Sequence, residues 1–200
     1  LGRSAKILSV CFEPNPELAA VIGSRPVMVT SGLTPLEGLP GRTTCGELDP
    51  GIIITLRNKM KWGPERIGEM LTKESGLLGL TGEPADIEQV MTSQRYDGSL
   101  AKEVMNYRFL LACGAGMAAM GGLDDIVFSG RHASIGSRLG SSLISRIFEG
   151  DSSKAAAIRV ASFGKSIERI VADEAAAMFI AASSKDAPSA KRFSAEAEPI

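Results

Sequence analysis

The sequence predicts one α/β domain, with a mixed sheet that opens as an antiparallel meander and is flanked by helices. Two observations favour this class. Three short apolar runs, separated by turn-forming residues, open the chain and indicate strands over residues 5–12, 18–22 and 26–30. Strand-like and helix-like segments then alternate in the second half, which is typical of a mostly parallel arrangement. At 200 residues the chain is long enough to bury a substantial core.

Helical spacing of apolar residues predicts the elements that follow the meander. One helix is expected over residues 51–61, and Gly63 and Pro64 break its pattern, so that Pro64 opens the next helix. Further helices are predicted over residues 85–92 and 99–120. The long helix carries an apolar stripe formed by Leu100, Val104, Tyr107, Leu111 and Ala115.

The last part of the chain continues the alternation. A buried strand, a helix, a second strand and a closing helix are predicted over residues 125–129, 137–148, 156–163 and 167–182. After Ser183 the composition turns to Ser, Ala, Lys, Glu and Pro, which is typical of a mobile terminus. We therefore expect a domain over residues 1–183 and a flexible tail over residues 184–200.

Composition restricts the class of protein. Hydrophobic residues make up 44% and charged residues 22%, with a formal net charge of −1. These values are typical of a globular protein and argue against a nucleic-acid or membrane partner, which would need a concentrated basic patch. Cys11, Cys45 and Cys113 are widely spaced and accompanied by one histidine, so neither a disulfide framework nor a zinc site is indicated. A cytoplasmic location is expected, and because Leu1 is not methionine, so is a fragment or processed product.

Residues 31–51 form a segment rich in glycine and proline, which excludes a continuous helix or strand. A surface connection with ordinary turn chemistry is one interpretation. The other is a functional loop, because long irregular loops in compact domains often carry function.

The residues of this segment resemble a known family. Leu33-Thr34-Pro35-Leu36-Glu37-Gly38-Leu39 is similar to the FTPLEGL segment of the acetate kinase family, and residues 45–51, CGELDPG, are similar to its TRSGDxDPG segment. Residues 73–82 resemble KKSGLLGLSG, and residues 121–124 and 126–130 resemble GGLDAIVFTAG. The likeness spans residues 5–181 and corresponds to the C-terminal half of such a kinase.

This resemblance implies fold, cofactors and partners. It implies an actin-like ATPase domain of the ribonuclease H-like type. The family's reaction transfers a phosphoryl group between ATP or ADP and a short-chain carboxylate, with Mg²⁺. A homodimer is also implied, because family members dimerise through this half.

The family's phosphate-binding segments align with altered residues here. Its first phosphate loop, HLGNG, aligns with residues 12–16, where Asn15 is kept but two prolines and Glu13 suit an anion poorly. Its transition-state arginine aligns with Thr44, and Arg42 could take that role from two residues earlier. Alternatively, Arg42 pairs with an acidic residue of the same segment: Glu37, Glu47 or Asp49.

Two further segments are implied at the nucleotide. The adenine-side segment aligns with residues 85–88 and retains Asp86, while Glu88 replaces an arginine. The second nucleotide loop, GIGEN, aligns with residues 131–135, where Arg131 and His132 could attract a phosphate or a carboxylate, although a loop histidine is also often a bystander. The candidate nucleotide-binding residues are Asn15, Asp86, Gly130, Arg131, His132 and Ser134.

Glu174 matches the acidic residue that serves the family's magnesium site. An acidic residue in the first turn of a helix also stabilises that helix, so both interpretations stand.

Three functional hypotheses follow. The first is a diverged kinase lobe that is weakly active or inactive as this chain alone. The second is one lobe of an active short-chain carboxylate kinase, completed by an N-terminal lobe, in which Arg42, Arg131 and Glu174 take over displaced roles. The third is a non-catalytic module for small-molecule binding or dimerisation.

Overall fold

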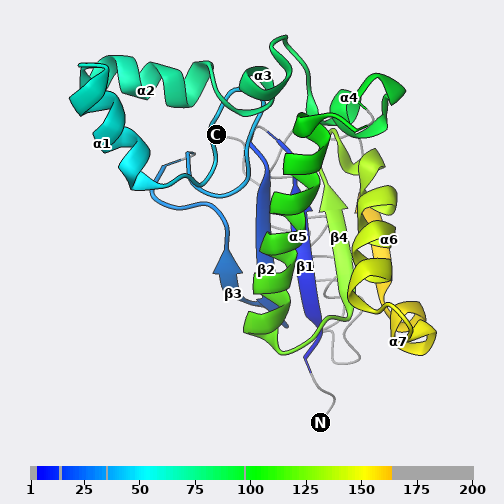
Figure 1. Cartoon of the computed structure of the whole chain (residues 1–200). Coiled ribbons are helices and arrows are strands. Elements are labelled where there is room, and N and C mark those ends of the chain that lie inside the picture. Colours follow the sequence, from blue (N-terminus) through cyan, green and yellow to red (C-terminus); the bar gives the residue numbers. More distant parts are fainter. Residues whose placement is uncertain (1–3, 14, 35, 97, 164–200) are drawn as a thin grey trace, which may run out of the picture.

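A five-stranded mixed sheet forms the centre of the computed structural model, which describes residues 4–13, 15–34, 36–96 and 98–163 (Figure 1). The strands are β1 (Lys6–Cys11), β2 (Glu17–Ile22), β3 (Arg25–Val29), β4 (Asp125–Ser129) and β5 (Arg159–Phe163). Their order is β3-β2-β1-β4-β5. The first three form an antiparallel meander, and β4 and β5 run parallel to β1. The predicted mixed sheet is confirmed.

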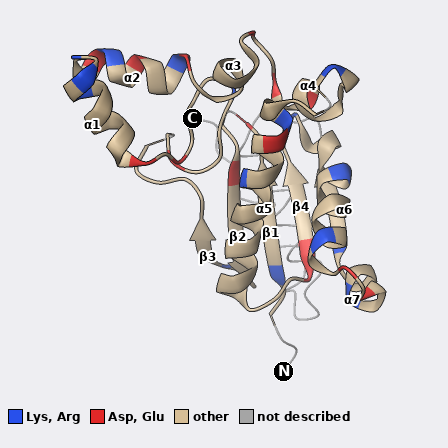
Figure 2. Cartoon of the chain, viewed as in Figure 1, with Lys and Arg blue, Asp and Glu red and all other residues tan. Residues whose placement is uncertain are grey.

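Seven α-helices connect these strands in the described part of the chain. They are α1 (Pro50–Lys59), α2 (Pro64–Lys73), α3 (Gly76–Thr81), α4 (Ile87–Thr92), α5 (Leu100–Met120), α6 (Gly136–Ile147) and α7 (Ser152–Ala157). Helices α5 and α6 lie on one face of the sheet, and α1 and α2 form an arm that projects from it (Figure 1). Figure 2 shows basic and acidic residues interspersed on this arm.

The helix starts follow from local sequence. Asp49 accepts a hydrogen bond from the Gly51 amide at 2.8 Å, and Pro50 then opens α1. Pro64 opens α2 as predicted, because its missing amide costs nothing at the first helical position. Asp86 caps α4 with a reciprocal capping box to Gln89.

Two helices were not predicted. Helix α3 has six residues, which is too short for an apolar periodicity to show. Helix α7 covers the start of the strand expected over residues 156–163, so that β5 begins only at Arg159. Asp151 caps α7 by accepting a hydrogen bond from the Lys154 amide at 3.1 Å.

The main core lies between the sheet and helices α4, α5 and α6. Phe12, Phe109 and Phe128 meet there with ring centroids 6.2–6.3 Å apart. The buried face of α5 is a different one from the predicted stripe: it consists of Ala101, Met105, Phe109, Cys113, Gly116 and Met120. Within the predicted stripe, Leu100 and Tyr107 are instead exposed by 62% and 60%.

Close packing explains which face of α5 is buried. A side chain at Gly116 would meet Leu8 and Ala20 of the sheet, so a small residue is needed where the helix crosses the strands. Burial also raises the pKa of the Cys113 thiol. Because α5 is apolar around most of its circumference, periodicity alone does not select its buried face.

No helix in the described part of the chain is long and apolar enough to cross a membrane. The closing helix expected over residues 167–182 and the tail expected over residues 184–200 lie outside the described residues.

Candidate functional site

Two loops emerge side by side from neighbouring strands. The loop over residues 12–16 follows β1, and the loop over residues 130–134, here called the β4 loop, follows β4. Because β1 and β4 are parallel and Cys11 pairs with Ser129, both loops leave the same edge of the sheet. Crevices at the carboxyl ends of parallel strands are where open α/β sheets commonly bind ligands. The structure therefore brings the two predicted phosphate-binding segments together.

An ion pair joins these two loops. One carboxylate oxygen of Glu13 accepts the backbone amide of Arg131 at 2.7 Å, and the other lies 2.8 Å from the Arg131 Nε. The Glu13 side chain is only 15% exposed, whereas that of Arg131 is 58% exposed. The amide and guanidinium that could attract a ligand anion are therefore occupied by a carboxylate of the same chain.

A second carboxylate reaches the same loop from α4. Glu88 lies 3.2 Å from the Nδ1 of His132 and accepts a hydrogen bond from the Ser134 hydroxyl at 3.1 Å. The His132 side chain is 12% exposed, so it is a partnered group in this structure. Glu88 stands where the resemblance implies an arginine, and it reverses the charge that the β4 loop meets.

Asp86 has a defined structural role at the start of α4. Its carboxylate accepts the Gln89 amide at 2.8 Å, while the Gln89 side chain accepts the Asp86 amide at 3.0 Å. This capping box explains the contacts of the Asp86 carboxylate, and no bound ligand is needed to explain them. A role for Asp86 at the nucleotide stays a prediction.

Asn15 and Thr44 are brought together by the fold. The Thr44 hydroxyl donates a hydrogen bond to the Asn15 side-chain oxygen at 3.2 Å. A side chain at Gly41 would collide with both groups, which shows how tightly the segment over residues 31–49 packs against the loop after β1. Two of the predicted site residues are thus neighbours, and both are uncharged.

The side chain of Arg42 is exposed and forms no ion pair with any residue that the structure describes. The predicted partner Glu47 instead lies 3.4 Å from Arg108 of α5. The backbone at Arg42 is held in place, because its carbonyl accepts the Leu78 amide at 2.9 Å. Arg42 is therefore a cation on a fixed backbone.

The magnesium prediction rests on Glu174, which lies outside the described residues. Within the part that the structure describes, no group of three or more His, Cys, Asp or Glu residues could hold a metal ion. The two carboxylates at the β4 loop, Glu13 and Glu88, are already engaged by Arg131, His132 and Ser134.

Sequence reasoning had not identified the partners of the β4 loop. Charge was the available signal: Glu13 and Glu88 stand in two predicted binding segments, and Arg131 and His132 in a third. Their pairing requires the fold, because Glu13 and Arg131 are 118 residues apart in the chain.

A groove on another part of the surface was also not predicted. It has a volume of about 310 Å³ and lies between β3, the segment that includes Glu37 and Glu47, and α5. Val29, Leu111 and Ala115 contribute apolar lining, and Arg108 contributes a positive charge.

Comparisons with known proteins identify the family. A model described as the acetokinase family matches residues 6–175. The chain belongs to the acetokinase family. The acetate kinase of Trichormus variabilis is 36% identical over 135 residues, which cover 64% of this chain and 33% of that protein. The acetate kinase of Rickettsia typhi is 36% identical over 112 residues, covering 56% and 29% of the two chains.

Solved structures confirm the fold of this acetokinase family member. A propionate kinase from Francisella tularensis superposes with a TM-score of 0.65 at 24% identity, covering 80% of this chain and 47% of that one. The acetate kinase of Porphyromonas gingivalis gives 0.66 at 22% identity, with 89% and 49% covered. The predicted actin-like ATPase fold is thereby confirmed. The chain spans about a third of the length of the curated relatives it matches.

Proposed function

We propose that this chain is a carboxylate-kinase lobe whose phosphate-binding loops are occupied by its own carboxylates. Alone, it binds nucleotide weakly and does not transfer a phosphoryl group from ATP to a short-chain carboxylate. The observation that carries the proposal is the two-point contact of Glu13 with the amide and guanidinium of Arg131.

Electrostatics support this proposal. A nucleotide phosphate at the β4 loop would have to displace Glu13 and approach Glu88, which contacts the same loop. Two like unit charges 4 Å apart near a protein surface repel each other by about 4 kcal/mol. Such a penalty outweighs the gain of one or two ordinary hydrogen bonds, which contribute about 1 kcal/mol each.

Calorimetric titration of the chain with magnesium-ATP and magnesium-ADP tests the proposal. We expect no saturable heat at micromolar nucleotide. Micromolar binding of either nucleotide would refute the occupied-loop account.

The alternative is one lobe of an active kinase that an N-terminal lobe completes. Arg42 favours it, because an exposed cation on a fixed backbone is available for a transferring phosphoryl group. In that case Thr44 and Asn15 would position the loop, and Arg131 and Glu174 would contact nucleotide and metal. An acyl phosphate assay with acetate, propionate and butyrate distinguishes the two: turnover that Arg42→Ala abolishes supports this alternative.

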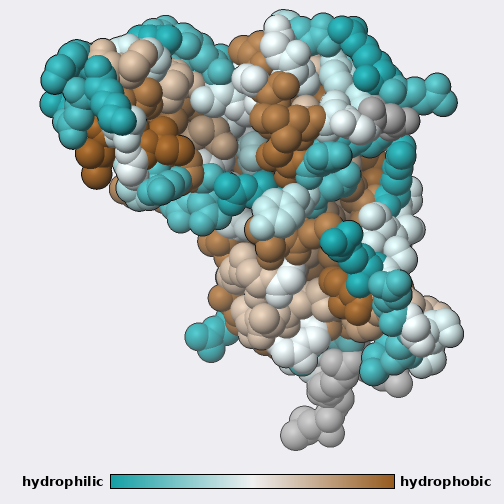
Figure 3. All heavy atoms as spheres, viewed as in Figure 1, coloured by the Kyte–Doolittle hydropathy of each residue, from teal (hydrophilic) through white to brown (hydrophobic). Residues whose placement is uncertain are grey.

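We also propose that the chain self-associates as a homodimer through the outer face of α5. Tyr107 and Leu111 are exposed by 60% and 49%, and Figure 3 shows apolar surface along α5. Glu47 and Arg108 of the groove beside them already pair with each other at 3.4 Å, so the apolar side chains would supply a two-fold contact without leaving a charge unpaired. A second copy of this chain therefore fits the surface.

Sedimentation analysis tests the homodimer. Leu111→Glu should shift the wild-type dimer to a monomer, whereas Ile147→Glu, an equally polar change at an exposed position of α6, should leave it dimeric. A wild-type chain that sediments as a monomer at micromolar concentration would exclude this interface.

A further inference from the structure

The β4 loop directs four hydrogen-bonding groups at two carboxylates. The amide and Nε of Arg131 bind Glu13, and the His132 Nδ1 and the Ser134 hydroxyl bind Glu88. The two carboxylates arrive from separate elements, the loop after β1 and the first turn of α4.

We infer that Glu13 and Glu88 are specificity-determining residues whose carboxylates take the place of a bound anion. Once both carboxylates are removed, the β4 loop holds a phosphate oxyanion. This inference rests on the proposed function, because it explains which groups keep nucleotide phosphates out.

The backbone of the β4 loop does not depend on the two carboxylates. Gly130 has a φ of +87°, and a side chain there would approach the Cys11 sulfur to 3.2 Å, so glycine and its packing set the start of the loop. Backbone hydrogen bonds join Ala133 to Gly130 and Ile135 to His132 at 3.1 and 3.2 Å. Ala133 and Ile135 are buried in the core, which anchors the far end. We therefore expect the loop backbone, including the Arg131 amide, to keep its place when the carboxylates are removed.

The charges favour an anion in place of the carboxylates. Arg131 is the one permanently positive side chain of this network and meets two carboxylates, Glu13 and Glu88. Removing both carboxylates leaves the Arg131 guanidinium and amide, the imidazole and the Ser134 hydroxyl without these partners. Charge-assisted hydrogen bonds to an oxyanion are the strongest replacement available to such donors.

The test is a titration of the double variant Glu13→Ala/Glu88→Ala with inorganic phosphate. His132 is the single histidine of the chain, so its imidazole NMR signal reports the site without assignment. We expect the signal to shift on titration, with an affinity at least about tenfold higher than that of the unmodified chain.

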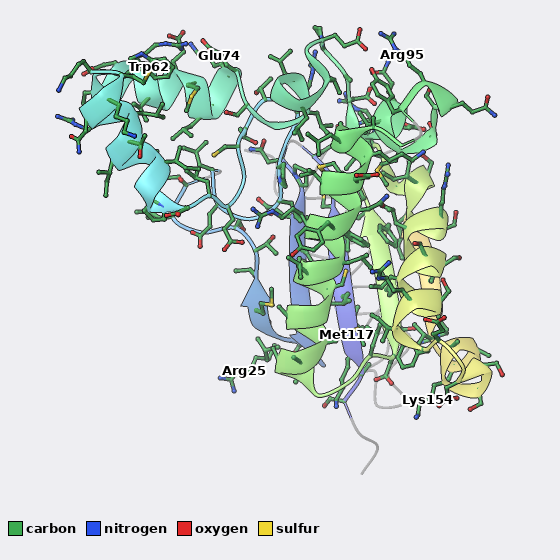
Figure 4. All side chains as sticks on the ribbon, viewed as in Figure 1. Arg25, Trp62, Glu74, Arg95, Met117 and Lys154 are labelled. Atoms are coloured by element: carbon green, nitrogen blue, oxygen red, sulfur yellow. The ribbon has the colours of Figure 1, made fainter. Side chains whose placement is uncertain are left out.

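A matched control lies on and directly after α2. Glu69 and Glu74 both pair with Arg66, at 3.9 and 2.6 Å, and Figure 4 shows Glu74 on the projecting arm. Glu69→Ala/Glu74→Ala removes the same two charges and also deprives one arginine of its carboxylates. We expect phosphate to leave the His132 signal of this variant unchanged.

The inference is overturned if the folded Glu13→Ala/Glu88→Ala variant binds phosphate no more tightly than the unmodified chain or the α2 control. Should that variant fail to fold, Glu88→Ala decides, because its side chain is 45% exposed and its loss frees His132 and Ser134. If phosphate does not shift the His132 signal of the Glu88→Ala variant, the inference is overturned as well. Tight magnesium-ATP binding by the unmodified chain would instead overturn the proposed function itself.

Discussion

The segment over residues 31–49 and the β4 loop both lack strands and α-helices, but they contact the other elements through different groups. Backbone hydrogen bonds fix the segment to α2 and α3: Leu71 accepts the Cys45 amide, and Thr43 accepts the Ser75 amide, both at 3.0 Å. Charged side chains from other elements close over the β4 loop. Backbone contacts tolerate most substitutions and side-chain contacts do not. Under the proposed function, this is why the scaffold of a kinase lobe persists while its anion site changes.

The largest effect is expected at Gly76, the first residue of α3, which packs against the segment over residues 31–49. Its φ is +60°, and a side chain there would overlap the carbonyl oxygens of Gly41 and Thr44. Gly76→Ala should lower the free energy of unfolding by about 3–5 kcal/mol, measured by urea denaturation. Gly68→Ala in α2, where nothing lies within 4 Å, is the control and should be neutral or stabilising by up to about 1 kcal/mol. Equal losses in both variants would contradict the role assigned to Gly76.

Glu13→Gln should have an intermediate effect. The amide oxygen of Gln still accepts the Arg131 amide, but the charge that faces the guanidinium is lost. We expect the free energy of unfolding to fall by about 1–2 kcal/mol. Glu65→Gln, on the exposed side of α2, should stay within about 0.5 kcal/mol of the unmodified chain. A loss at Glu13 as small as this would mean that the two loops are held by something else.

Glu88→Gln should cost less than Glu13→Gln, because Glu88 is 45% exposed and water screens its contacts with the β4 loop. We expect about 0.5 kcal/mol or less in the same denaturation experiment, together with a changed environment of the His132 imidazole by NMR. An unchanged imidazole signal would argue against their contact in solution.

The smallest effect concerns the surface pair Arg66–Glu74 on the α1–α2 arm. The hydrogen bond from Arg66 lowers the pKa of Glu74 below its ordinary value in the folded chain. Its contribution to stability is therefore present above the unfolded pKa of about 4.3 and lost as the pH falls through the folded pKa. The urea midpoint of the unmodified chain should fall between about pH 7 and about pH 3. In Glu74→Gln this fall should be slightly smaller. No reduction would mean that this pair is not formed in solution.

Local patterns predicted much of the fold. The three opening runs, the proline that opens α2, the strand over residues 125–129 and the long helix ending at Met120 were correct, because each depends on neighbours in sequence. The short α3 and α7 escaped prediction, since six residues do not establish a period. The exposed stripe of α5 was apolar as expected, but the need for Gly116 against Leu8 placed the opposite side on the sheet.

The candidate site was predicted as a set of residues and not as a network. Motif likeness located Asn15, Thr44, Arg131 and His132 in segments that the structure does bring to one edge of the sheet. Their partners depend on which loops meet. Arg42, expected either at the reaction centre or in an ion pair with its own segment, forms no such pair among the described residues.

Sequence alone determined the family, the order of most elements and the charges that each loop carries, because these are properties of contiguous residues. Only the tertiary structure decided that Glu13 neutralises Arg131 and that Glu88 binds His132, across 118 and 44 residues of chain. The parallel pairing of β1 with β4 aligns the ends of distant strands, and Coulomb attraction between the side chains that then meet selects the partners.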